Sequence, residues 1–405
     1  MSSYRYLILG GGMVAGYAAQ AFVEGGVGPG ELCIVSAEAS LPYERPPLSK
    51  GFMAGQARAD ELLINQAAFY REHGIDLRLD TPVARVDFAG KRLISAAGEA
   101  INYDKLLLAT GARVRKLKLP GAGLAGVYTL RSLEDASRIR EAASGARQVV
   151  VIGGGYIGTE VSASLAQRGL PITVLLSGAG LLPRLFTSEM SAFFQSYFSA
   201  RGVTFIANVH ATGLTGQDRA EAVELDSGQL LPADLVVAGI GVTPETSLFA
   251  DTPLQLDERG ITVNEYLETN LPDVYAAGDA VSYWDLIFNK RRHVEHWNNA
   301  VEGGKHVAKV MLGQREAFRE IPYFFSDVFD LSWEFWGDNE AADRVIYRGQ
   351  PESGSFSTWW LKDGRLMAAF VMNRPDQERE LAPKWIAAGK LVSPAQLADS
   401  SQALG

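Results

Sequence analysis

The chain has 405 residues and a net charge of -9, with 47% hydrophobic and 21% charged residues. This length predicts two or three domains. The acidic balance argues against a nucleic-acid-binding surface, which needs an excess of basic residues. No apolar run approaches the roughly 18 residues of a membrane span. The start, "MSSYRYLILGGG", lacks the basic and apolar regions of a secretory signal. We therefore expect a cytoplasmic protein without a membrane or nucleic-acid partner.

The first predicted unit is a strand, a glycine turn and an amphipathic helix, in "YRYLILGGGMVAGYAAQAF" from Tyr4. Gly10, Gly12 and Ala15 fit the dinucleotide-binding pattern G-x-G-x-x-G/A. The first glycine permits a tight turn, the second lets the backbone approach a pyrophosphate, and the third small residue lets the helix pack on the strand. The free N–H groups of the helix N-terminus favour the pyrophosphate. The next strand leads to Glu38, where an acidic residue is expected to bind a ribose.

That next strand, "ELCIVSAE", holds Cys33, the single cysteine of the chain. One thiol can form neither an internal disulfide nor a CxxC redox pair, so dithiol–disulfide exchange within the chain is excluded. We interpret Cys33 as a small apolar residue in a buried strand. A reducing compartment fits this cysteine content, and no metal site is predicted.

A second copy of the motif follows the short predicted strands "DLRLD", "KRLISAAG" and "KLLLAT". In "RQVVVIGGGYIGTEVSASLA", Gly153, Gly155 and Gly158 take the three small-residue positions. Two copies in their strand-turn-helix context predict two dinucleotide sites. After the second copy, "ITVLLSGAG" offers no carboxylate for a ribose, and Arg184 follows. The second nucleotide is therefore NAD or NADP.

Later strands also end in glycine turns, in "ADLVVAGIGVTPET" and "DVYAAGDAV". Ligands of doubly wound folds lie at the carboxyl ends of strands, so Gly241, Gly278 and Asp279 are expected beside the cofactors. The alternative for Asp279 is a turn-capping role. After about residue 315, "GSFSTWWLKDGRLMAAFVM" predicts a hairpin with its turn at residues 362–364, and "APKWIAAGKLV" predicts a short helix.

The predicted fold class is α/β, with two Rossmann-like dinucleotide-binding domains and a C-terminal α+β domain. The expected segments are residues 1–115 and 244–315 for an FAD-binding domain, 116–243 for an NAD(P)H-binding domain, and 316–405 for the C-terminal domain.

The segments "LPYERPPLSK", "YDKLLLATGA", "VVVIGGGYIGTE", "DVYAAGDA" and "VEHWNNA" occur in this order. With them the chain resembles the two-dinucleotide flavoprotein reductases of the glutathione-reductase fold, over essentially its whole length. It is similar to the branch that holds monodehydroascorbate reductases, ferredoxin and rubredoxin reductases, and apoptosis-inducing-factor-like proteins. The nearest likeness is to the plant-type monodehydroascorbate reductases. This resemblance implies FAD and NAD(P)H as cofactors.

The resemblance also implies roles for individual residues. Those implied to contact FAD are Gly10, Gly12, Ala15, Glu38, Arg45, Lys50, Val83, Thr110, Gly111, Arg131, Gly278 and Asp279. Those implied to contact NAD(P)H are Gly153, Gly155, Tyr156, Ile157, Gly158, Glu160 and Gly241. Glu295, His296 and Trp297 are implied to lie where nicotinamide and flavin meet. Among these, Lys50, Glu160 and Trp297, together with Phe325, are expected to serve electron transfer. Lys50 is expected to stabilise the reduced flavin, to pair with Glu160, or both.

Three positions depart from the plant-type enzymes. Where this chain has Trp297 and Asn298, those enzymes carry alanine and an arginine that is implicated in ascorbate binding. Where this chain has Phe325, they carry a tyrosine. Trp297 is instead what ferredoxin-type reductases have beside the flavin.

Three functions remain open on these grounds. The first is reduction of a small anionic radical, monodehydroascorbate. The second is reduction of a small iron–sulfur or rubredoxin-type electron-transfer protein, and the third is a redox-sensing role like that of the apoptosis-factor-like proteins. Two basic runs, "ARVRKLKLP" and "NKRRH", are either solvated loops or docking patches for an anionic partner.

The segment "PYFFSDVFDLSWEFWGD", Pro322 to Asp338, is rich in aromatic residues. Most of it is expected to form core, with Trp333 and Trp336 as packing residues. Phe324 and Phe325 are expected to reach the flavin edge.

Overall fold

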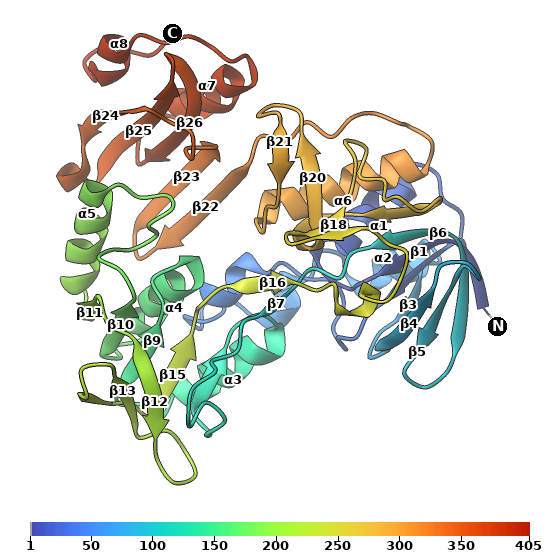
Figure 1. Ribbon diagram of the computed structural model, residues 1–405, viewed down its shortest axis with the longest axis horizontal. Helices are drawn as coiled ribbons and strands as arrows, with labels where there is room; N and C mark the ends of the chain where they lie inside the picture. The colour runs from blue at the N-terminus through green and yellow to red at the C-terminus, as the bar shows by residue number, and fades with distance from the viewer. Residues whose placement is uncertain (1) are drawn as a thin grey trace. The chain divides into compact units, whose positions relative to one another are not determined.

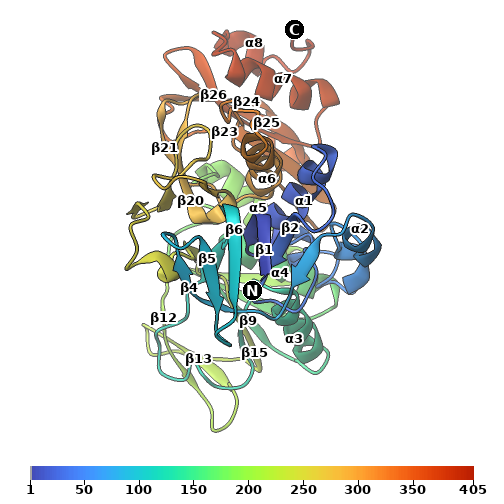
Figure 2. The ribbon, with the colours of Figure 1, turned by 90° about the vertical axis from the view of Figure 1, so that its right-hand side faces the viewer.

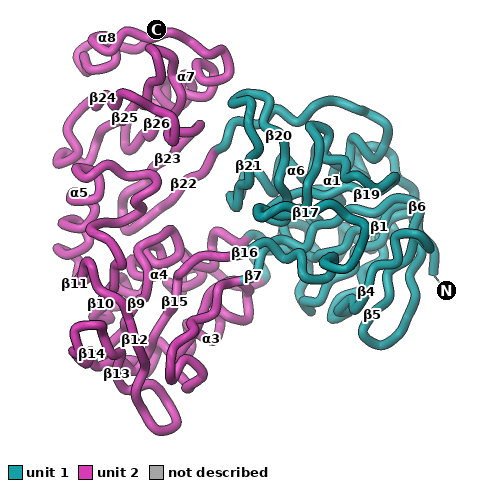
Figure 3. The backbone as a smooth tube through the Cα atoms, in the orientation of Figure 1, with its two compact units in different colours: residues 1–44, 60–113, 243–322 teal, residues 45–59, 114–242, 323–405 magenta. Residues whose placement is uncertain are grey.

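The computed structural model describes residues 2–405 (Figures 1 and 2). It contains two compact units (Figure 3). Unit 1 comprises the residues up to Glu44, Asp60–Arg113 and Thr243–Pro322, and unit 2 comprises Arg45–Ala59, Val114–Val242 and Tyr323–Gly405. The predicted four-segment domain division stays a prediction. Within the described residues, no helix has the length and apolar character that crossing a membrane requires.

Unit 1 is built on a seven-stranded sheet in the order β3-β2-β1-β6-β5-β4, with β19 paired to the end of β6. β1, β2, β3, β6 and β19 are parallel, and β4 and β5 are antiparallel to their neighbours. The central strands are continuous apolar runs because both faces of the sheet are covered. The strands are β1 (Ser2–Leu9), β2 (Leu32–Val35), β3 (Asp76–Arg78), β4 (Val83–Asp87), β5 (Arg92–Ser95), β6 (Ala100–Leu108) and β19 (Val274–Ala276). Cys33 is fully buried in β2, as predicted.

Two helices of unit 1, α1 (Met13–Glu24) and α6 (Trp297–Met311), lie side by side (Figures 1 and 2). They approach so closely that a Cβ at Gly304 would lie 2.7 Å from the carbonyl oxygen of Val14. A four-stranded sheet in the order β17-β18-β20-β21 completes the unit. Its remaining elements are β17 (Leu256–Asp257), β18 (Gly260–Thr262), β20 (Val281–Asp285), β21 (Lys290–Arg292), α2 (Ala67–Glu72), η2 (Ala59–Leu62, from the end of the preceding segment), η3 (Ser247–Phe249) and η4 (Gly278–Ala280).

Unit 2 contains a five-stranded parallel sheet in the order β11-β10-β9-β15-β8. A three-stranded antiparallel sheet, β12-β13-β14, belongs to the same unit. Its elements are β8 (Val127–Thr129), α3 (Leu133–Ala143), β9 (Val149–Ile152), α4 (Tyr156–Gln167), β10 (Ile172–Leu176), α5 (Ser188–Ser199), β11 (Val203–Ala207), β12 (Ala211–Thr215), β13 (Ala222–Leu225), β14 (Leu230–Pro232), β15 (Leu235–Ala238) and η1 (Pro46–Ser49). β7 (Ala112–Val114) and β16 (Val242–Pro244) carry the chain across the boundary of the two units.

The C-terminal part of unit 2 is an antiparallel sheet in the order β22-β23-β26-β25-β24. The aromatic segment forms the β22–β23 hairpin, and Trp333 and Trp336 are buried, as predicted. The predicted hairpin with its turn after Lys362 is also present. The predicted helix over residues 382–392 is present only in part, because the observed helix begins earlier, at Asp376, and ends at Ala387. These elements are β22 (Tyr323–Val328), β23 (Leu331–Gly337), β24 (Arg344–Gln350), η5 (Pro351–Ser353), β25 (Ser355–Lys362), β26 (Arg365–Met372), α7 (Asp376–Ala387) and α8 (Pro394–Ala398).

Candidate functional site

Four of the segments predicted to bind FAD meet at one edge of the large sheet of unit 1. Leu9, Val35, Leu108 and Ala276 are register partners on neighbouring parallel strands, so their carboxyl ends lie together. The residues that follow these ends include Gly10, Glu38, Thr110 and Asp279. Ligands of open α/β sheets bind at such an edge. The topology therefore brings these four predicted residues to one place.

The first glycine turn joins β1 to α1. Gly10 has a φ of +125°, and a Cβ there would lie 2.1 Å from the carbonyl oxygen of Ala109, so only glycine fits. Gly12 is the N-cap of α1, and Ala15 is fully buried. The turn thus has the close packing that the pattern predicts, with the helix N-terminus at the sheet edge.

Glu38, the predicted ribose ligand, is held by two neighbours. The Tyr43 hydroxyl donates to Glu38 Oε2 at 2.6 Å, and the Glu38 backbone N–H donates to Ser36 Oγ at 3.1 Å. Tyr43 is buried, so its hydroxyl offers the carboxylate a fixed partner. Sequence reasoning missed Tyr43, because no motif marks a tyrosine five residues after the carboxylate.

Replacing Tyr43 by phenylalanine is expected to weaken FAD binding by roughly three- to tenfold. The ring stays in place, but Glu38 loses a charge-assisted hydrogen bond that aims it. Fluorescence titration of FAD-free protein with FAD measures the change. Tyr266→Phe is the matched control, because the Tyr266 hydroxyl has no hydrogen bond to residues 2–405. Equal FAD affinity for Tyr43→Phe and the control would refute a role of Tyr43 in holding Glu38.

The other unit 1 residues predicted to contact FAD take different local roles. Thr110 Oγ1 donates to the Glu245 carbonyl at 2.7 Å, and the Glu245 backbone N–H donates to the Gly111 carbonyl at 2.8 Å. Val83 starts β4 and packs at the margin of the unit 1 core. Gly278 has a φ of +79°, so its backbone conformation already requires glycine. Contacts of these residues with FAD stay a prediction.

The second glycine turn joins β9 to α4 in unit 2. The absence of a side chain at its three glycines has a different structural explanation at each position. Gly153 has a φ of +112°, and a Cβ there would lie 2.4 Å from the Gly239 carbonyl oxygen. A Cβ at Gly158 would lie 1.9 Å from the Gly153 carbonyl oxygen. Gly155 has an ordinary φ of -81°, and a Cβ there would meet no protein atom within 4 Å. The protein's own packing does not require Gly155, so the open space beside it fits a pyrophosphate at the helix N-terminus.

The neighbouring strand ends complete this edge of the unit 2 sheet. Leu175 of β10 and Ala238 of β15 are both register partners of Ile152 at the end of β9. Ser177 and Gly241 follow these two strands, so they lie close to the glycine turn that follows β9. Gly241 has a φ of +97°. Arg184 is exposed, and its charge lies close enough to oppose the rise that burial causes in the pKa of Tyr156. These features fit NAD and NADP equally.

Glu160 of α4 is the centre of a buried polar cluster. Lys50 Nζ lies 2.7 Å from Glu160 Oε1, so the predicted ion pair is present. Ser326 Oγ donates to Oε1 at 2.6 Å, and Ser49 Oγ donates to Oε2 at 2.5 Å. The side chains of Lys50 and Glu160 are 15% and 6% exposed. Low exposure makes such a pair sensitive to loss of either partner. Sequence reasoning missed Ser49 and Ser326, because serine is common at surfaces and carries no spacing signal.

Phe325 lies close to Lys50, whose Nζ is 5.7 Å from the centre of the phenylalanine ring. Phe324 does not accompany it, because alternate residues of β22 point to opposite faces. The Phe324 ring is buried and packs on Tyr156 and Trp333, with ring centres 4.8 and 5.4 Å away. The expectation that both phenylalanines reach the flavin edge is therefore corrected, because Phe324 is a core residue.

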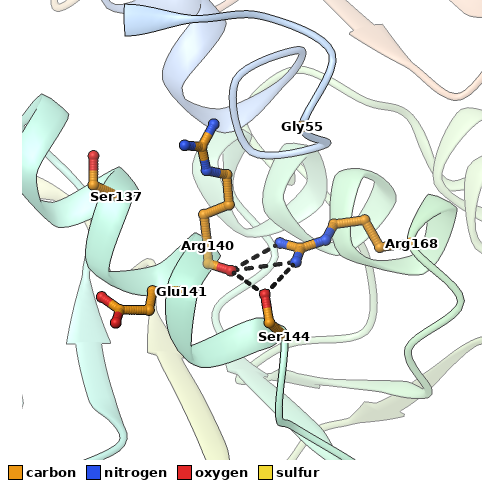
Figure 4. Close-up of a pocket in the computed structure, with 6 residues that line it drawn as sticks. All are labelled: Gly55, Ser137, Arg140, Glu141, Ser144 and Arg168. Carbon is orange, nitrogen blue, oxygen red and sulfur yellow. Dashed lines mark hydrogen bonds between the residues drawn. The ribbon is translucent and has the colours of Figure 1, made fainter.

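Two arginines support the segment that carries Lys50 (Figure 4). The Arg140 guanidinium lies 4.3 Å from the centre of the Phe52 ring, and Arg168 Nη1 donates to the Met53 carbonyl at 3.4 Å and to the Arg140 carbonyl at 3.2 Å. Burial, together with the charge of Arg140, lowers the pKa of Arg168. Arg140 and Arg168 line a cavity of about 440 Å³, together with Gly55, Ser137, Glu141 and Ser144. No predicted cofactor ligand lines it.

Elsewhere in unit 2, Arg45 Nη1 donates to the Arg131 carbonyl at 2.5 Å, which brings together two predicted FAD residues.

The segment that includes Glu295, His296 and Trp297 leads into α6 of unit 1. His296 is the N-cap of the helix, and Trp297 is its first residue. Glu295 is exposed, and its Oε1 lies 2.8 Å from His293 Nε2. Desolvation lowers the pKa of His296 to about 4, so its imidazole is neutral at pH 7. The residue can donate or accept a hydrogen bond there but brings no charge.

The unfolding free energy is expected to fall as the pH drops from about 6.5 towards 4, partly through His296. The folded pKa of about 4 lies below the ordinary 6.5, so the unfolded chain binds a proton that the folded chain does not. His296 contributes at most about 1.4 kcal/mol per pH unit, because the two states differ by a single bound proton. Thermal unfolding of wild type and His296→Asn between pH 7 and 5 measures this. An identical pH dependence in the two proteins would contradict the assignment.

The two basic runs behave differently from one another. "NKRRH" is neither a loop nor a free patch, since it contains β21, where Arg292 Nε lies 2.5 Å from Asp285 Oδ2 and Arg291 donates to the carbonyls of Ser282 and Val263. In "ARVRKLKLP", Arg115 and Lys116 are exposed, as is Lys118. Within the described chain, only the second run therefore keeps exposed cations that could meet an anionic partner.

Asn298, at the position of the arginine in plant-type enzymes, lies among carboxylates of unit 1. Burial and the charge of Glu302 raise the pKa of Glu320, and Asn298 lies close enough to oppose this rise. Lys305 Nζ lies 2.9 Å from Glu302 Oε1, so this lysine is already paired. The position lacks the cation that an anionic acceptor would prefer.

Comparisons with known proteins agree with this geometry. Residues 4–304 match the family model described as pyridine nucleotide-disulphide oxidoreductase, and residues 323–405 match the model described as reductase C-terminal. A monodehydroascorbate reductase of Pisum sativum is 37% identical over 94% of this chain and 93% of its own length. The crystal structure of a ferredoxin reductase from Rhodopseudomonas palustris is similar with a TM-score of 0.93, at 32% identity, over 99% of this chain and 98% of that one. A putidaredoxin reductase, solved in covalent complex with putidaredoxin, is similar with a TM-score of 0.94, at 31% identity, over 99% and 97% of the two chains.

Proposed function

Because the chain belongs to the pyridine nucleotide-disulphide oxidoreductase family, we propose that it passes electrons from NAD(P)H singly to a small organic radical of the monodehydroascorbate type. The coarser activity, an NAD(P)H-dependent flavoprotein reductase that uses FAD, follows from the family and its relatives. The observation that carries the finer proposal is the 37% identity to a monodehydroascorbate reductase over nearly the full length of both chains. With one cysteine the chain cannot use a dithiol pair, which suits direct transfer to an external acceptor.

In this proposal the described residues bind and orient, and no acid–base pair is required. FAD, when bound, supplies hydride acceptance from NAD(P)H and release of single electrons. Gly10, Gly12 and Glu38 hold FAD at the unit 1 sheet edge, and Gly153 and Gly155 receive the NAD(P)H pyrophosphate. Lys50 brings a positive charge whose position Glu160 and its serine partners fix. We also propose a cytoplasmic location, since a chain with a single cysteine needs no oxidising compartment.

A second candidate is reduction of a small iron–sulfur or rubredoxin-type protein. Trp297 favours it, and so does the similarity to a reductase that was solved in complex with putidaredoxin. Asn298 and Phe325 also favour it, because neither offers an anionic radical a charged partner. An acidic partner protein would need exposed cations such as Arg115, Lys116 and Lys118.

Steady-state oxidation of NADH and of NADPH by the FAD-loaded protein tests both candidates. The acceptors compared are the ascorbate radical, generated in situ, a [2Fe–2S] ferredoxin, a rubredoxin, and ferricyanide as a non-specific control. Radical turnover near the ferricyanide rate, and insensitive to salt, supports the first candidate. Protein turnover that falls as ionic strength rises supports the second, because charged docking is screened by salt. Ferricyanide turnover alone would reject both.

Asn298→Arg sharpens this test. The variant restores the guanidinium of the plant-type enzymes, so the KM for the ascorbate radical should fall if the radical binds there. Gln314→Arg adds the same charge at an exposed position of unit 1 and serves as the matched control. An unchanged radical KM in Asn298→Arg would argue that the acceptor binds elsewhere.

A further inference from the structure

The carboxylate of Glu44 accepts hydrogen bonds from two side chains that come from distant parts of the sequence within unit 1. Trp297 Nε1 donates to Glu44 Oε2 at 2.6 Å, and the Tyr17 hydroxyl donates to Glu44 Oε1. Tyr17 lies on α1, and Trp297 begins α6. Both rings pack at the margin of the unit 1 core. Each carboxylate oxygen thus has its own aromatic donor, and the bond to the indole is a charge-assisted one.

The surroundings of Tyr17 stabilise its hydrogen bond to Glu44. Burial and the charge of Glu44 both raise the pKa of Tyr17, so its hydroxyl stays protonated and keeps donating. Lys305 Nζ lies 5.5 Å from the centre of the Tyr17 ring, which places a cation over the ring face. A carboxylate held on one side by such a donor presents its other oxygen to Trp297 in a fixed direction.

We propose that Glu44 is a positioning residue that fixes the indole of Trp297 for electron transfer. The inference rests on the proposed function, in which Trp297 lies beside the flavin. A half-buried indole at the first position of a helix has several ring orientations open to it, and a short bond from Nε1 selects one. Glu44 acts through Trp297, and its removal frees the indole while leaving the glycine turns and Glu38 intact.

Fluorine NMR of the FAD-loaded protein labelled with 5-fluorotryptophan tests the proposal directly. The chain has 7 tryptophans, and Trp297→Phe identifies the signal of Trp297 by its loss. Glu44→Leu should shift the Trp297 signal and broaden it at least about twofold, because the ring gains mobility. Glu44→Gln keeps an acceptor oxygen and should retain a narrow signal. Glu24→Gln, at the exposed end of α1, is the matched control.

A double-mutant cycle adds a functional readout. Glu44→Leu should lower kcat with ferricyanide by about tenfold in the wild-type background, and should have no further effect in Trp297→Phe. Tyr17→Phe, which loosens only the far side of Glu44, should give an intermediate loss and covers the case in which Glu44→Leu does not fold. An unmoved Trp297 signal in Glu44→Leu, or additive losses in the cycle, would overturn the proposal.

The same measurements separate this inference from the proposed function. Ferricyanide needs no specific acceptor site, so absence of radical and ferredoxin turnover rejects the proposed acceptors and leaves the Glu44 result standing. A Trp297 signal that is identical in FAD-free and FAD-loaded wild type would overturn the inference, because the indole would not be beside the flavin.

Discussion

Gly155→Val is expected to lower the affinity for NAD(P)H by at least about 100-fold while the protein folds and binds FAD normally. A Cβ at this position meets no protein atom within 4 Å, and φ is ordinary, so the fold itself tolerates a Cβ. The same side chain would occupy the space at the N-terminus of α4 where the pyrophosphate should lie. Losing several N–H contacts to a phosphate group accounts for the size of the effect.

Stopped-flow reduction at varied NADH and NADPH concentrations measures the affinity, and thermal unfolding checks the fold. Gly145→Ala is the matched control, because a Cβ there also meets nothing within 4 Å but the residue lies at the far end of α3, away from the glycine turn. Gly158→Val is a contrasting variant that should fail to fold, since its Cβ would lie 1.9 Å from a backbone carbonyl oxygen. Normal nucleotide affinity in Gly155→Val would disprove the proposed pyrophosphate position.

Glu160→Ala is expected to slow flavin reduction by NAD(P)H by about 100-fold. The change removes the partner of Lys50 and the acceptor of the Ser326 hydroxyl, and it leaves the Ser49 hydroxyl only the Pro46 carbonyl as an acceptor. Breaking a buried pair by removing one partner costs roughly 3–5 kcal/mol. Part of this cost appears as a lower unfolding temperature, and part appears as a Lys50 charge that is no longer held in place.

Three further variants separate the contributions. Glu160→Gln keeps hydrogen-bond acceptance and should lie between wild type and Glu160→Ala in rate. Lys50→Met with Glu160→Leu removes both charges, so it should recover unfolding temperature but not rate. Glu134→Ala, whose partner Arg138 is exposed, is the control for loss of a surface pair. Wild-type reduction rates in Glu160→Ala would show that the pair serves stability alone.

Much of the fold could be predicted because local patterns report local geometry. The two glycine turns, the buried strand around Cys33 and the β25–β26 hairpin depend on residues that are neighbours in the chain. The clearest case is Gly153, whose positive φ follows from the turn itself, whereas its close approach to Gly239 comes from a neighbouring strand. The Lys50–Glu160 pair was anticipated only through a family resemblance, because 110 residues separate its partners in the sequence.

The expectations that failed did so because a sequence shows which side chains are present but not the direction in which each one points. Phe324 and Phe325 are adjacent and chemically identical, and only the pleat of β22 sends one into the core and the other towards Lys50. Arg292 looked like a free surface cation, and only the fold supplies Asp285 as its buried partner.

The sequence by itself determined the two glycine turns where dinucleotides are predicted to bind, and it excluded an internal dithiol mechanism, since these conclusions need only glycine spacing and a cysteine count. Only the tertiary structure decided which side chains aim the residues of the site. The hydrogen bond between Tyr43 and Glu38 lies within a single loop. The hydrogen bonds between Ser326 and Glu160 and between Trp297 and Glu44 instead join positions that are 166 and 253 residues apart. Hydrogen bonds between such positions have no periodicity or spacing in the chain, because packing of distant elements brings their atoms together.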